Sequence, residues 1–477
     1  MTQEALEYYL ADRSRRGPAP EGAVSGSAGG APCGDLVRIS VGLGDGHIDR
    51  VSFDAEGCSA SGAAAAALAE RVDGISLLDA ALITPEDVAG DLCGLSPTHR
   101  HAAELAADAL HRALSVAAGD GGALAPSGGE RVLIALSGGV DSAVAALLER
   151  ERGAEVVAVT VKLWADQATD GERSCCSPEA VLRARRVAHS LGIPHFTLDL
   201  QPEFRAGVVD PFLAGYAAGR TPNPCVLCNG EVRIDAMIAL AGRLGCSALA
   251  TGHYARLTGD GGEMLLARPA DPEKDQTYML SAIEPSSLAR MRFPLGDLTK
   301  PEVRELAADA GLEVAGRAES QDLCFLAGQG KRGFLQRHAG LGDRAGAIVD
   351  AGGRRLGEHA GHHNFTVGQR RGIGIGSPEP LYVLGTDAGS NRVTVGRHSE
   401  LETRTVRIRG ARLHRVAERV NAVRLRYRSP ARSCRLELAA EGRDAVISLA
   451  EPAGRVAPGQ IACLMDGDVV IGHGTVA

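Results

Sequence analysis

The sequence predicts a multidomain α/β protein built around a doubly wound parallel sheet. At 477 residues the chain is longer than a single hydrophobic core usually organises. In its middle part, strand patterns such as RVLIAL and EVVAVTV alternate with helical patterns such as EAVLRARRVAHSLG, an order that is typical of a parallel sheet covered by helices. Past about residue 395 the apolar runs become short, alternating and separated by turn residues, which indicates a small antiparallel β-barrel.

These changes of pattern divide the chain into four domains. Residues 1–116 combine alternating strands with helices in an α+β domain, and residues 117–129 form a Gly- and Ala-rich linker without periodicity. Residues 130–325 contain the predicted parallel sheet, residues 326–395 form a Gly-rich connecting domain, and residues 396–477 form the barrel. Ligands of such a sheet bind at the carboxyl ends of its strands, so we expect the functional site there.

The two ends of the chain differ in charge. Residues 1–118 hold 17 acidic residues against 8 arginines, whereas residues 401–477 hold 13 arginines against 8 acidic residues. The basic end is consistent with a nucleic-acid partner, although an ordinary solvated surface explains the charge equally well.

The chain shows no segment for secretion or membrane insertion. Its start, MTQEALEYYLADRSRRG, lacks the apolar stretch of a signal peptide, and no later window approaches 18 consecutive apolar residues. We therefore expect a cytoplasmic protein without a membrane partner. In that compartment the 11 cysteines are more readily interpreted as metal ligands or reactive thiols than as disulfides.

A glycine-containing loop predicts a phosphate-binding site. Residues 137–142, SGGVDS, lie between the strand RVLIAL and the helical pattern SAVAALLERERG, so we expect a helix to begin at Asp141 or Ser142. Two glycines allow the backbone to present N–H groups to an anion, and the helix N-terminus adds a positive dipole end. The loop lacks the Gly-Lys-Ser/Thr ending of the Walker loop, so we expect no lysine at a γ-phosphate and no γ-phosphoryl transfer. A plain strand–turn–helix connection is the alternative.

The SGGxDS pattern resembles the PP-loop of ATP pyrophosphatases, which split ATP into AMP and pyrophosphate and adenylate an oxygen of their substrate. The resemblance implies that Asp141 helps to bind Mg²⁺ and that Val161 and Gly252, at the ends of two strands, border the adenine nucleotide. These strand-end positions also fit the place of ligands in doubly wound sheets. The residues that would hold the phosphates of ATP are Ala135, Leu136, Ser137, Gly138, Gly139, Val140, Asp141 and Ser142.

Two loops carry candidate thiols. Cys228 lies in TPNPCVLCN and Cys324 in AESQDLCFLAG, polar stretches in which a thiolate is expected to be exposed and reactive. An adenylated oxygen is a good leaving group, so a thiol nearby predicts its replacement by sulfur.

These loops, together with TGHYAR, EKDQTYML, FTVGQRRGIGIG and RLRYRS, closely resemble the tRNA-specific 2-thiouridylases from about residue 130 to the C-terminus. This family replaces the C2 oxygen of uridine 34, the wobble base of the tRNA anticodon, by sulfur. The resemblance implies an ATP-dependent tRNA-uridine 2-sulfurtransferase in which Cys228 is the nucleophile and Cys324 carries persulfide sulfur. It also implies that the basic barrel binds the tRNA anticodon loop, whose splayed-out base enters a pocket under the ATP site. The implied base and tRNA contacts are Asn223, Pro224, Cys225, His253, Lys274, Asp275, Gln276, Arg426, Tyr427 and Gln460.

One position departs from the better-known form of this family. Cys225 stands where that form has aspartate, and together with Cys228 and Cys324 it gives three thiols. Three alternatives remain open for them. We favour a [4Fe-4S] cluster on the three cysteines, whose open iron binds hydrosulfide and delivers it to the adenylated base. The others are a persulfide relay through Cys228 and Cys324 without Cys225, and a zinc site.

The remaining cysteines past the linker are not predicted to bind metal. Vicinal Cys175 and Cys176 make a poor chelate for one tetrahedral ion. Three further cysteines lie in apolar patterns typical of small core residues: Cys246, Cys434 and Cys463.

The N-terminal block places Cys33 and Asp35 on a glycine turn before a strand and Cys58 just before a small-residue helix. This block resembles the iron–sulfur scaffold proteins of the IscU and NifU N-terminal type. The resemblance implies a zinc or iron–sulfur site formed by these three residues with His101. In that family a cysteine follows this histidine; here alanine follows it, and Cys93, eight positions earlier, is a distant substitute.

We expect this N-terminal domain to receive sulfur or a cluster from a cysteine desulfurase, or from another sulfur donor, and to pass it to the attached enzyme. Tethering raises the effective concentration of the donor to roughly millimolar. The alternative is a degenerate scaffold that serves as a docking piece.

A second function also remains open, that of an iron–sulfur cluster or sulfur carrier in which the nucleotide domain is a regulated platform. Both hypotheses place ATP at residues 137–142. Substituting Asp141 by Ala separates them, because a thiolase loses AMP formation whereas a carrier still transfers its cargo.

Overall fold

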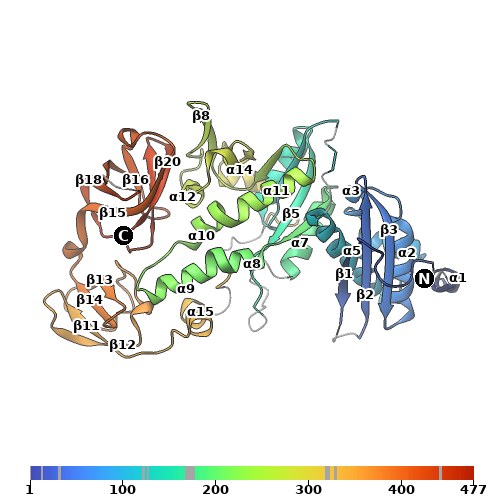
Figure 1. Ribbon diagram of the computed structural model, residues 1–477, viewed down its shortest axis with the longest axis horizontal. Helices are drawn as coiled ribbons and strands as arrows, with labels where there is room; N and C mark the ends of the chain where they lie inside the picture. The colour runs from blue at the N-terminus through green and yellow to red at the C-terminus, as the bar shows by residue number, and fades with distance from the viewer. Residues whose placement is uncertain are drawn as a thin grey trace.

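The chain forms an elongated molecule, with the N-terminal domain at one end of a central α/β domain and two small β domains at the other end (Figure 1). This computed structural model describes residues 2–11, 14–30, 34–120, 124–125, 128–166, 178–316, 323–326, 330–439 and 443–477. Within those ranges, no helix combines the length and the apolar character needed to cross a lipid bilayer.

The N-terminal domain is an antiparallel sheet of three strands covered on one face by helices. The turn between its second and third strands, at Asp45 and Gly46, has φ angles of 49° and 79°, the conformation of a two-residue hairpin turn. Gly26 lets the last helix approach the sheet closely, since a Cβ there would lie 2.2 Å from Ala109 O. The elements are α1 (Gln3–Ala11), β1 (Val24–Gly29), β2 (Leu36–Gly44), β3 (His47–Glu56), α2 (Ser59–Val72), α3 (Leu77–Ala80), α4 (Pro85–Asp91) and α5 (Arg100–Asp120).

The central domain contains a five-stranded parallel sheet, which confirms the predicted doubly wound arrangement. The strand order is β10-β7-β4-β5-β6. One face of the sheet, with Val132, Ile134 and Val156, packs against three helices of the same domain. The strands are β4 (Arg131–Ala135), β5 (Glu155–Lys162), β6 (His195–Asp199), β7 (Ala248–Thr251) and β10 (Met291–Arg292). The three helices are α6 (Val140–Glu151), α7 (Pro178–Ser190) and α14 (Lys300–Asp309).

The opposite face of this sheet is covered by α11 (Ile234–Arg243) and by α5, a helix of the N-terminal domain. Leu110 and Leu114 of α5 belong to the same buried cluster as Val157 of β5 and Phe196 of β6. Figure 1 shows α5 between the N-terminal sheet and the central sheet. The N-terminal domain is therefore docked through its own core, and α5 acts as a covering helix for both sheets.

Polar contacts accompany this docking. Arg185 Nη1 of α7 donates to Asp108 Oδ1 of α5 at 3.0 Å, and His189 Nε2 donates to Ala81 O at 3.0 Å. The ring of His189 lies 5.3 Å from that of His111, measured between centroids. Burial lowers the pKa of both histidines, and the nearby charge of Arg185 lowers it further. The interface thus holds neutral histidines beside a buried arginine.

We expect the free energy of unfolding to decrease as the pH falls below about 6.5. An unfolded histidine has a pKa of about 6.5, whereas the folded pKa of His111 and His189 is lower, so the unfolded state binds more protons in this window. Each such histidine changes the stability by about 1.4 kcal/mol per pH unit. Urea unfolding at a series of pH values measures the slope, and His111→Gln should reduce it. A stability that stays constant on acidification to about pH 5.5 would contradict this expectation.

Two helical segments flank the loop of residues 218–223, which lies just before Cys225 and Cys228. Each contains a π-helical turn, a wide turn that is often found at functional sites. Cys225 lies in the short helix after the loop, and Cys228 begins the π-helical turn that follows it. The segments are α8 (Gln201–Phe204), η1 (Arg205–Val209) and α9 (Asp210–Ala217) before the loop, and α10 (Pro224–Leu227), η2 (Cys228–Arg233) and α11 (Ile234–Arg243) after it.

The connecting domain, whose fold the sequence did not predict, is a four-stranded sheet with the order β12-β11-β14-β13. It begins with α15 (Gly330–Ala339), while α12 (Thr277–Leu280) and α13 (Pro285–Leu288) precede it in the central domain. Its strands are β11 (Gly346–Asp350), β12 (Arg355–His359), β13 (Tyr382–Asp387) and β14 (Arg392–Gly396).

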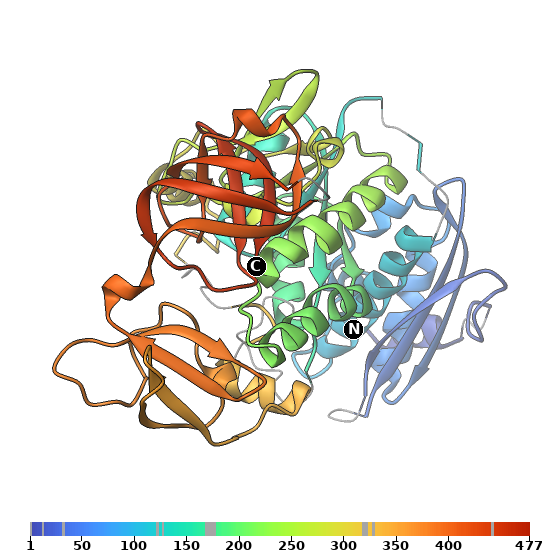
Figure 2. The same ribbon diagram turned by 60° about the vertical axis from the view of Figure 1, so that its left-hand side comes forward.

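The C-terminal domain, drawn in red in Figure 2, confirms the predicted antiparallel barrel. Six strands in the order β15-β18-β17-β16-β19-β20 close through the pairing of β15 with β20. Val406 and Ile408 face the core while Arg407 and Arg409 between and after them are exposed, as the alternating sequence predicts. The β8–β9 hairpin of the central domain pairs with β20 and extends this sheet. The strands are β8 (Arg256–Asp260), β9 (Glu263–Ala267), β15 (Glu402–Leu413), β16 (Ala422–Arg424), β17 (Arg432–Leu438), β18 (Ala445–Gly454), β19 (Ile461–Asp466) and β20 (Val469–Val476).

Candidate active site

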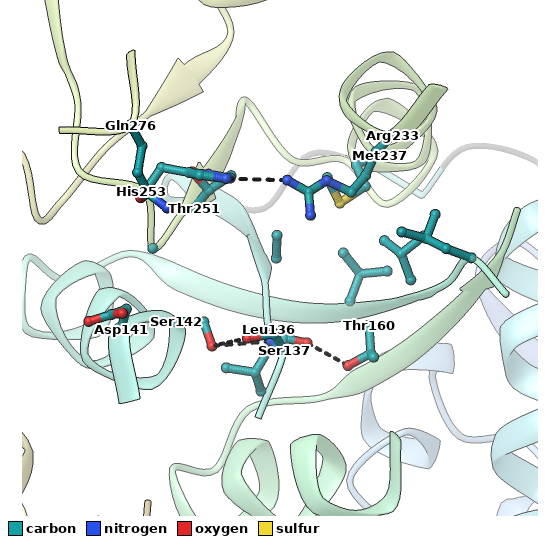
Figure 3. Close-up of a pocket in the computed structure, with 15 residues that line it drawn as sticks. Leu136, Ser137, Asp141, Ser142, Thr160, Arg233, Met237, Thr251, His253 and Gln276 are labelled. Carbon is teal, nitrogen blue, oxygen red and sulfur yellow. Dashed lines mark hydrogen bonds between the residues drawn. The ribbon is translucent and has the colours of Figure 1, made fainter. Parts of the chain in front are cut away.

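A cavity of about 250 Å³ lies at the carboxyl ends of β4, β5 and β7, where the strand order reverses direction. Figure 3 shows Ser137, Asp141 and Ser142 of the glycine loop on one side of this cavity and Arg233 and His253 on the opposite side. The cavity therefore lies where a doubly wound sheet binds its ligands. The lining residues among those predicted for ATP are Ala135, Leu136, Ser137, Asp141, Ser142, Val161 and Gly252.

The glycine loop is closed by hydrogen bonds within it. Gly138 has a φ of 70°, in the left-handed region. Ser142 Oγ donates to Gly139 O at 3.0 Å and accepts from Ser137 N at 3.1 Å. Helix α6 begins at Val140 with Gly139 as its N-cap, one residue earlier than predicted. The positive end of the α6 dipole is thereby directed at the cavity, as an anion site requires.

A lysine from a distant part of the chain lies beside this loop. Lys300 Nζ, at the start of α14, donates to Asp141 Oδ1 at 2.6 Å, and Tyr254 OH donates to the same oxygen at 2.9 Å. Lys300 is only 7% exposed, so its charge acts in a largely dry environment. Sequence reasoning missed Lys300 because 159 positions separate it from Asp141 and TKPEV reads as an ordinary helix start.

The opposite wall of the cavity carries an arginine that the sequence analysis also missed. Arg233 Nη2 donates to Asn229 Oδ1 at 2.5 Å and to His253 Nε2 at 3.2 Å (Figure 3). His253 Nδ1 in turn donates to Thr251 Oγ1 at 2.9 Å. Burial, followed by the charge of Arg233, lowers the pKa of His253 to about 3. His253 is therefore a neutral acceptor that orients Arg233.

The cysteine loop is less exposed than predicted. Cys228 is 8% exposed and belongs to an apolar cluster with Phe212 and Phe325, and Cys324 packs against the same cluster. The expectation of an exposed thiolate is wrong for Cys228, because the short helix α10 places this thiol among aromatic side chains. Burial, and then the charge of Cys228, raises the pKa of Cys225 to about 11, while the charge of Arg233 opposes this rise.

The segment predicted to contact the target base joins the central domain to the barrel. Gln460 Nε2 of the barrel donates to Thr221 O at 2.7 Å. Asn223 caps α10, since its Oδ1 accepts from Val226 N at 3.3 Å, and Pro224 is buried as the first residue of this helix. The loop before Cys225 is thus fixed from both sides.

The predicted tRNA-contact residues after β9 lie in different environments. Gln276 lines the cavity. Asp275 is 3% exposed, and its Oδ2 accepts from Arg424 Nη1 at 2.8 Å and from Arg268 Nε at 3.1 Å. Asp275 therefore orients two arginines and has little surface of its own, while Lys274 faces a neighbouring groove.

This groove has a volume of about 760 Å³ and lies between the segment at Lys274 and the barrel loop that contains Arg428. Arg424 also lines it. Arg428 has a φ of 61°, and its guanidinium lies over the ring of Tyr427 at 5.4 Å. Arg426 is exposed, and its Nη2 donates to a backbone carbonyl of the barrel at 2.9 Å. Basic side chains outnumber acidic ones in its lining, which suits a phosphate backbone.

A separate group of ligand atoms lies in the N-terminal domain. Among the described residues, only Asp35, Cys58 and His101 bring three such atoms within 4.8 Å of one another. Asp35 Oδ2 accepts from Cys58 Sγ at 3.2 Å, from His101 Nε2 at 2.9 Å and from Ser61 Oγ at 2.9 Å. Although burial raises the pKa of Asp35, these hydrogen bonds and one from the Cys58 backbone lower it well below its usual range. The carboxylate is therefore ionised and able to bind a cation.

The other cysteines considered as ligands lie elsewhere. Cys33, Cys175 and Cys176 are outside the described residues. Cys93 is exposed and does not belong to the three-ligand group of the N-terminal domain. Three predicted core cysteines are buried, as expected: Cys246, Cys434 and Cys463.

Family models match nearly the whole chain. The NifU-like N terminal domain matches residues 1–118, and the tRNA methyl transferase HUP domain matches residues 130–328. The tRNA methyl transferase PRC-barrel domain matches residues 332–397, and the Aminomethyltransferase beta-barrel domain matches residues 406–476. The order of these matches follows the order of the domains in the structure.

Curated relatives share this organisation. The bifunctional protein NifU/MnmA of Rubrobacter xylanophilus is 48% identical over 465 residues, which cover 95% of this chain and 93% of the relative. The tRNA-specific 2-thiouridylase MnmA of Acidobacterium capsulatum is 42% identical over 367 residues, 72% of this chain and 98% of the relative. That of Geobacter metallireducens is 42% identical over 356 residues, 73% of this chain and 96% of the relative. The chain therefore belongs to the tRNA-specific 2-thiouridylase family, in the form that joins a NifU-like N-terminal domain to the enzyme.

Proposed function

We propose that this protein uses ATP to replace the C2 oxygen of uridine 34 in the tRNA anticodon by sulfur. The observation that carries the proposal is the cavity at the strand ends. The glycine loop and Arg233 line the same space, and Arg233 ends the π-helical turn that Cys228 begins. A nucleotide on the loop and a base beside the thiols can therefore share one site.

In the first step the uridine O2 attacks the α-phosphorus of ATP, so that a new P–O bond forms and pyrophosphate leaves. The loop backbone and the N-terminus of α6 supply N–H donors and a positive dipole end to the phosphates. Asp141, oriented by Lys300, would hold the Mg²⁺ that accompanies ATP, because Mg²⁺ prefers carboxylate and phosphate oxygens. Val161 and Gly252 border the nucleotide from the ends of β5 and β7.

In the second step sulfur attacks C2, a C–S bond forms, the C2–O bond breaks, and AMP leaves with the former O2. With hydrosulfide as the nucleophile the step involves no oxidation or reduction, and the hydrosulfide proton ends on N3 of the base, which lost its own proton when O2 was adenylated. With a persulfide on Cys324, its terminal sulfur ends on C2 and a Cys228–Cys324 disulfide remains, which a thiol reductant must reopen. Cys228 takes part in both routes.

The three thiols fit a [4Fe-4S] cluster better than a zinc ion. Cys225 and Cys228 lie three positions apart on a helical segment, so their side chains are neighbours. Cys324 packs against the group of apolar side chains that contains Cys228. One zinc ion needs the sulfur of every thiolate ligand at about 2.3 Å from the metal. The sulfur atoms of these three described cysteines do not all lie within 4.8 Å of one another, which is too far apart for one ion. When bound, the [4Fe-4S] cluster would supply an iron that takes up inorganic sulfur. Metal binding would also deprotonate Cys225, whose pKa is otherwise about 11.

The N-terminal domain would supply the sulfur or the cluster. Asp35, Cys58 and His101 suit one zinc ion or part of an iron–sulfur site, and Cys33 would complete the set. A cysteine desulfurase, or another sulfur donor, would load this site. The docking of α5 on the central sheet favours transfer from a fixed position.

The tRNA would lie along the barrel side of the cavity. Lys274 and Arg428 line the basic groove, and Arg426 and Tyr427 lie beside it, so they would contact the phosphates and bases of the anticodon loop. Gln460 and the loop at Asn223 would enclose the flipped base. His253 and Asp275 are buried and would act by orienting Arg233 and two groove arginines.

The test is thiolation by the full chain, purified without oxygen, supplied with ATP, Mg²⁺, sulfide and a tRNA that carries U34. We expect 2-thiouridine at position 34 together with AMP, and no thiolation of the same tRNA with C34. In one arm of the test, Cys225→Ala should lose the bound iron, about four atoms per chain, and the sulfide-dependent activity. Cys434→Ala, at a buried barrel cysteine, is the matched control. In a second arm a cysteine desulfurase with cysteine replaces sulfide, because a persulfide on Cys324 needs sulfur already at the persulfide oxidation level. Thiolation at the full rate by Cys225→Ala without iron in this second arm would overturn the cluster and favour the persulfide relay.

A further inference from the structure

We propose that Arg233 binds the α-phosphate of the adenylated uridine, at the point where the nucleotide cavity meets the cysteine loop. This inference rests on the proposed function, because it assigns a group to one intermediate of that reaction. No motif of the sequence singled out Arg233, and its role follows from the geometry of the folded chain.

Arg233 is held in place before any ligand binds. Its Nη2 donates to Asn229 Oδ1 and to His253 Nε2, and Asn229 Nδ2 donates to Met279 O at 2.9 Å. His253 is fixed by Thr251. Figure 3 shows the guanidinium of Arg233, at the end of η2, pointing toward His253 on the side of the cavity opposite the glycine loop. An arginine fixed by neutral partners is preorganised for an anionic ligand.

The charge of Arg233 has no anionic partner among the described residues. No carboxylate of the described chain forms an ion pair with it, and its Nε is buried without a hydrogen-bond partner. Asn229 and neutral His253 accept hydrogen bonds but carry no negative charge. Arg233 is half-buried, and a partly desolvated guanidinium gains from an anion beside it, so the site favours a ligand with negative charge.

The position of Arg233 selects the α-phosphate among the anions of the reaction. The glycine loop and the N-terminus of α6, on the opposite side, suit the departing pyrophosphate. Arg233 lies five positions after Cys228 on the same π-helical turn, and therefore next to the sulfur side of the site. In the adenylated base the α-phosphate is bonded to the oxygen that leaves C2. As this bond breaks, negative charge increases on the phosphate, where the Nη1 hydrogens of Arg233, which form no hydrogen bond within the described residues, can stabilise it.

The experiment compares Arg233→Gln and Arg233→Lys with the unchanged full chain. Arg205→Gln, at an exposed arginine of the other π-helical turn, is the matched control. Thiolation is measured at saturating ATP and U34 tRNA, and the affinities for AMP and for adenosine are measured separately. These two ligands differ by the α-phosphate alone.

We expect Arg233→Gln to reduce thiolation by about a hundredfold and to reduce the preference for AMP over adenosine by about tenfold or more. Arg233→Lys should recover part of both, because it keeps the charge but loses the planar fork. An unchanged AMP preference in both variants would overturn the inference, even if thiolation is lost. If Arg233→Gln unfolds at a lower temperature than the unchanged chain, the AMP preference is judged from Arg233→Lys instead. Failure of the unchanged chain to thiolate tRNA would instead overturn the proposed function, since the AMP preference can be measured without it.

Discussion

Replacing Cys228 by Ser is expected to abolish tRNA thiolation, with a loss of at least about a thousandfold. A serine hydroxyl neither binds iron as a thiolate does nor forms the disulfide with Cys324 that releases the persulfide sulfur, so both routes to 2-thiouridine stop. The first step should survive, because Cys228 is not part of the glycine loop and does not line the nucleotide cavity. The variant should therefore still exchange labelled pyrophosphate into ATP in the presence of U34 tRNA.

The matched control for this substitution is Cys246→Ser. Cys246 is also buried, and burial raises its pKa to about 12, but it lies between α11 and β7 among core residues. We expect it to keep full thiolation with a small loss of stability. Thiolation by Cys228→Ser at a rate within about tenfold of the unchanged chain would contradict the role of this cysteine in sulfur transfer.

Replacing Asp141 by Ala is expected to stop the reaction one step earlier. Pyrophosphate exchange, AMP formation and thiolation should all fall by about a hundredfold or more, because the Mg²⁺ that accompanies ATP loses a carboxylate ligand. The same substitution separates the enzyme from a sulfur or cluster carrier, which would still transfer its cargo. The contrast with Cys228→Ser assigns the two residues to different steps.

Asp141→Asn is the necessary companion, because removing the carboxylate leaves the buried Lys300 ammonium without this partner. The asparagine oxygen can still accept from Lys300 and from Tyr254, while the negative charge is gone. Both variants should lose activity alike, and thermal unfolding should show that Asp141→Asn is the more stable of the two. An asparagine variant that forms AMP at the normal rate would show that the carboxylate charge is not needed.

Features that depend on contiguous residues could be read from the sequence. SGGVDS after an apolar strand predicts a glycine loop at a helix start, and the structure places it there, with the helix one residue longer than expected. The barrel was predictable because Val406 and Ile408 alternate with arginines, which is a local pattern. The fold of the connecting domain was not predictable, because its Gly-rich sequence has no clear period.

Exposure and pairing could not be predicted in the same way. TPNPCVLCN is polar in composition, yet Cys228 is buried, because α10 turns it towards aromatic residues that come from elsewhere in the chain. Asp275 resembles a surface contact in EKDQ, yet it is buried between two arginines, one of them 149 positions away. Burial depends on which segments pack together, and composition does not report that.

Local patterns of residues were enough to predict the order of the domains, the glycine loop, the candidate thiols and the family to which they point, because each is encoded by neighbouring residues. The tertiary structure alone decided that Lys300 meets Asp141, that Arg233 and His253 form the facing wall of the cavity, and that α5 of the N-terminal domain covers the central sheet. Each of these depends on contacts between residues far apart in the chain. Such contacts arise from the packing of whole helices and sheets, and no local pattern of residues specifies them.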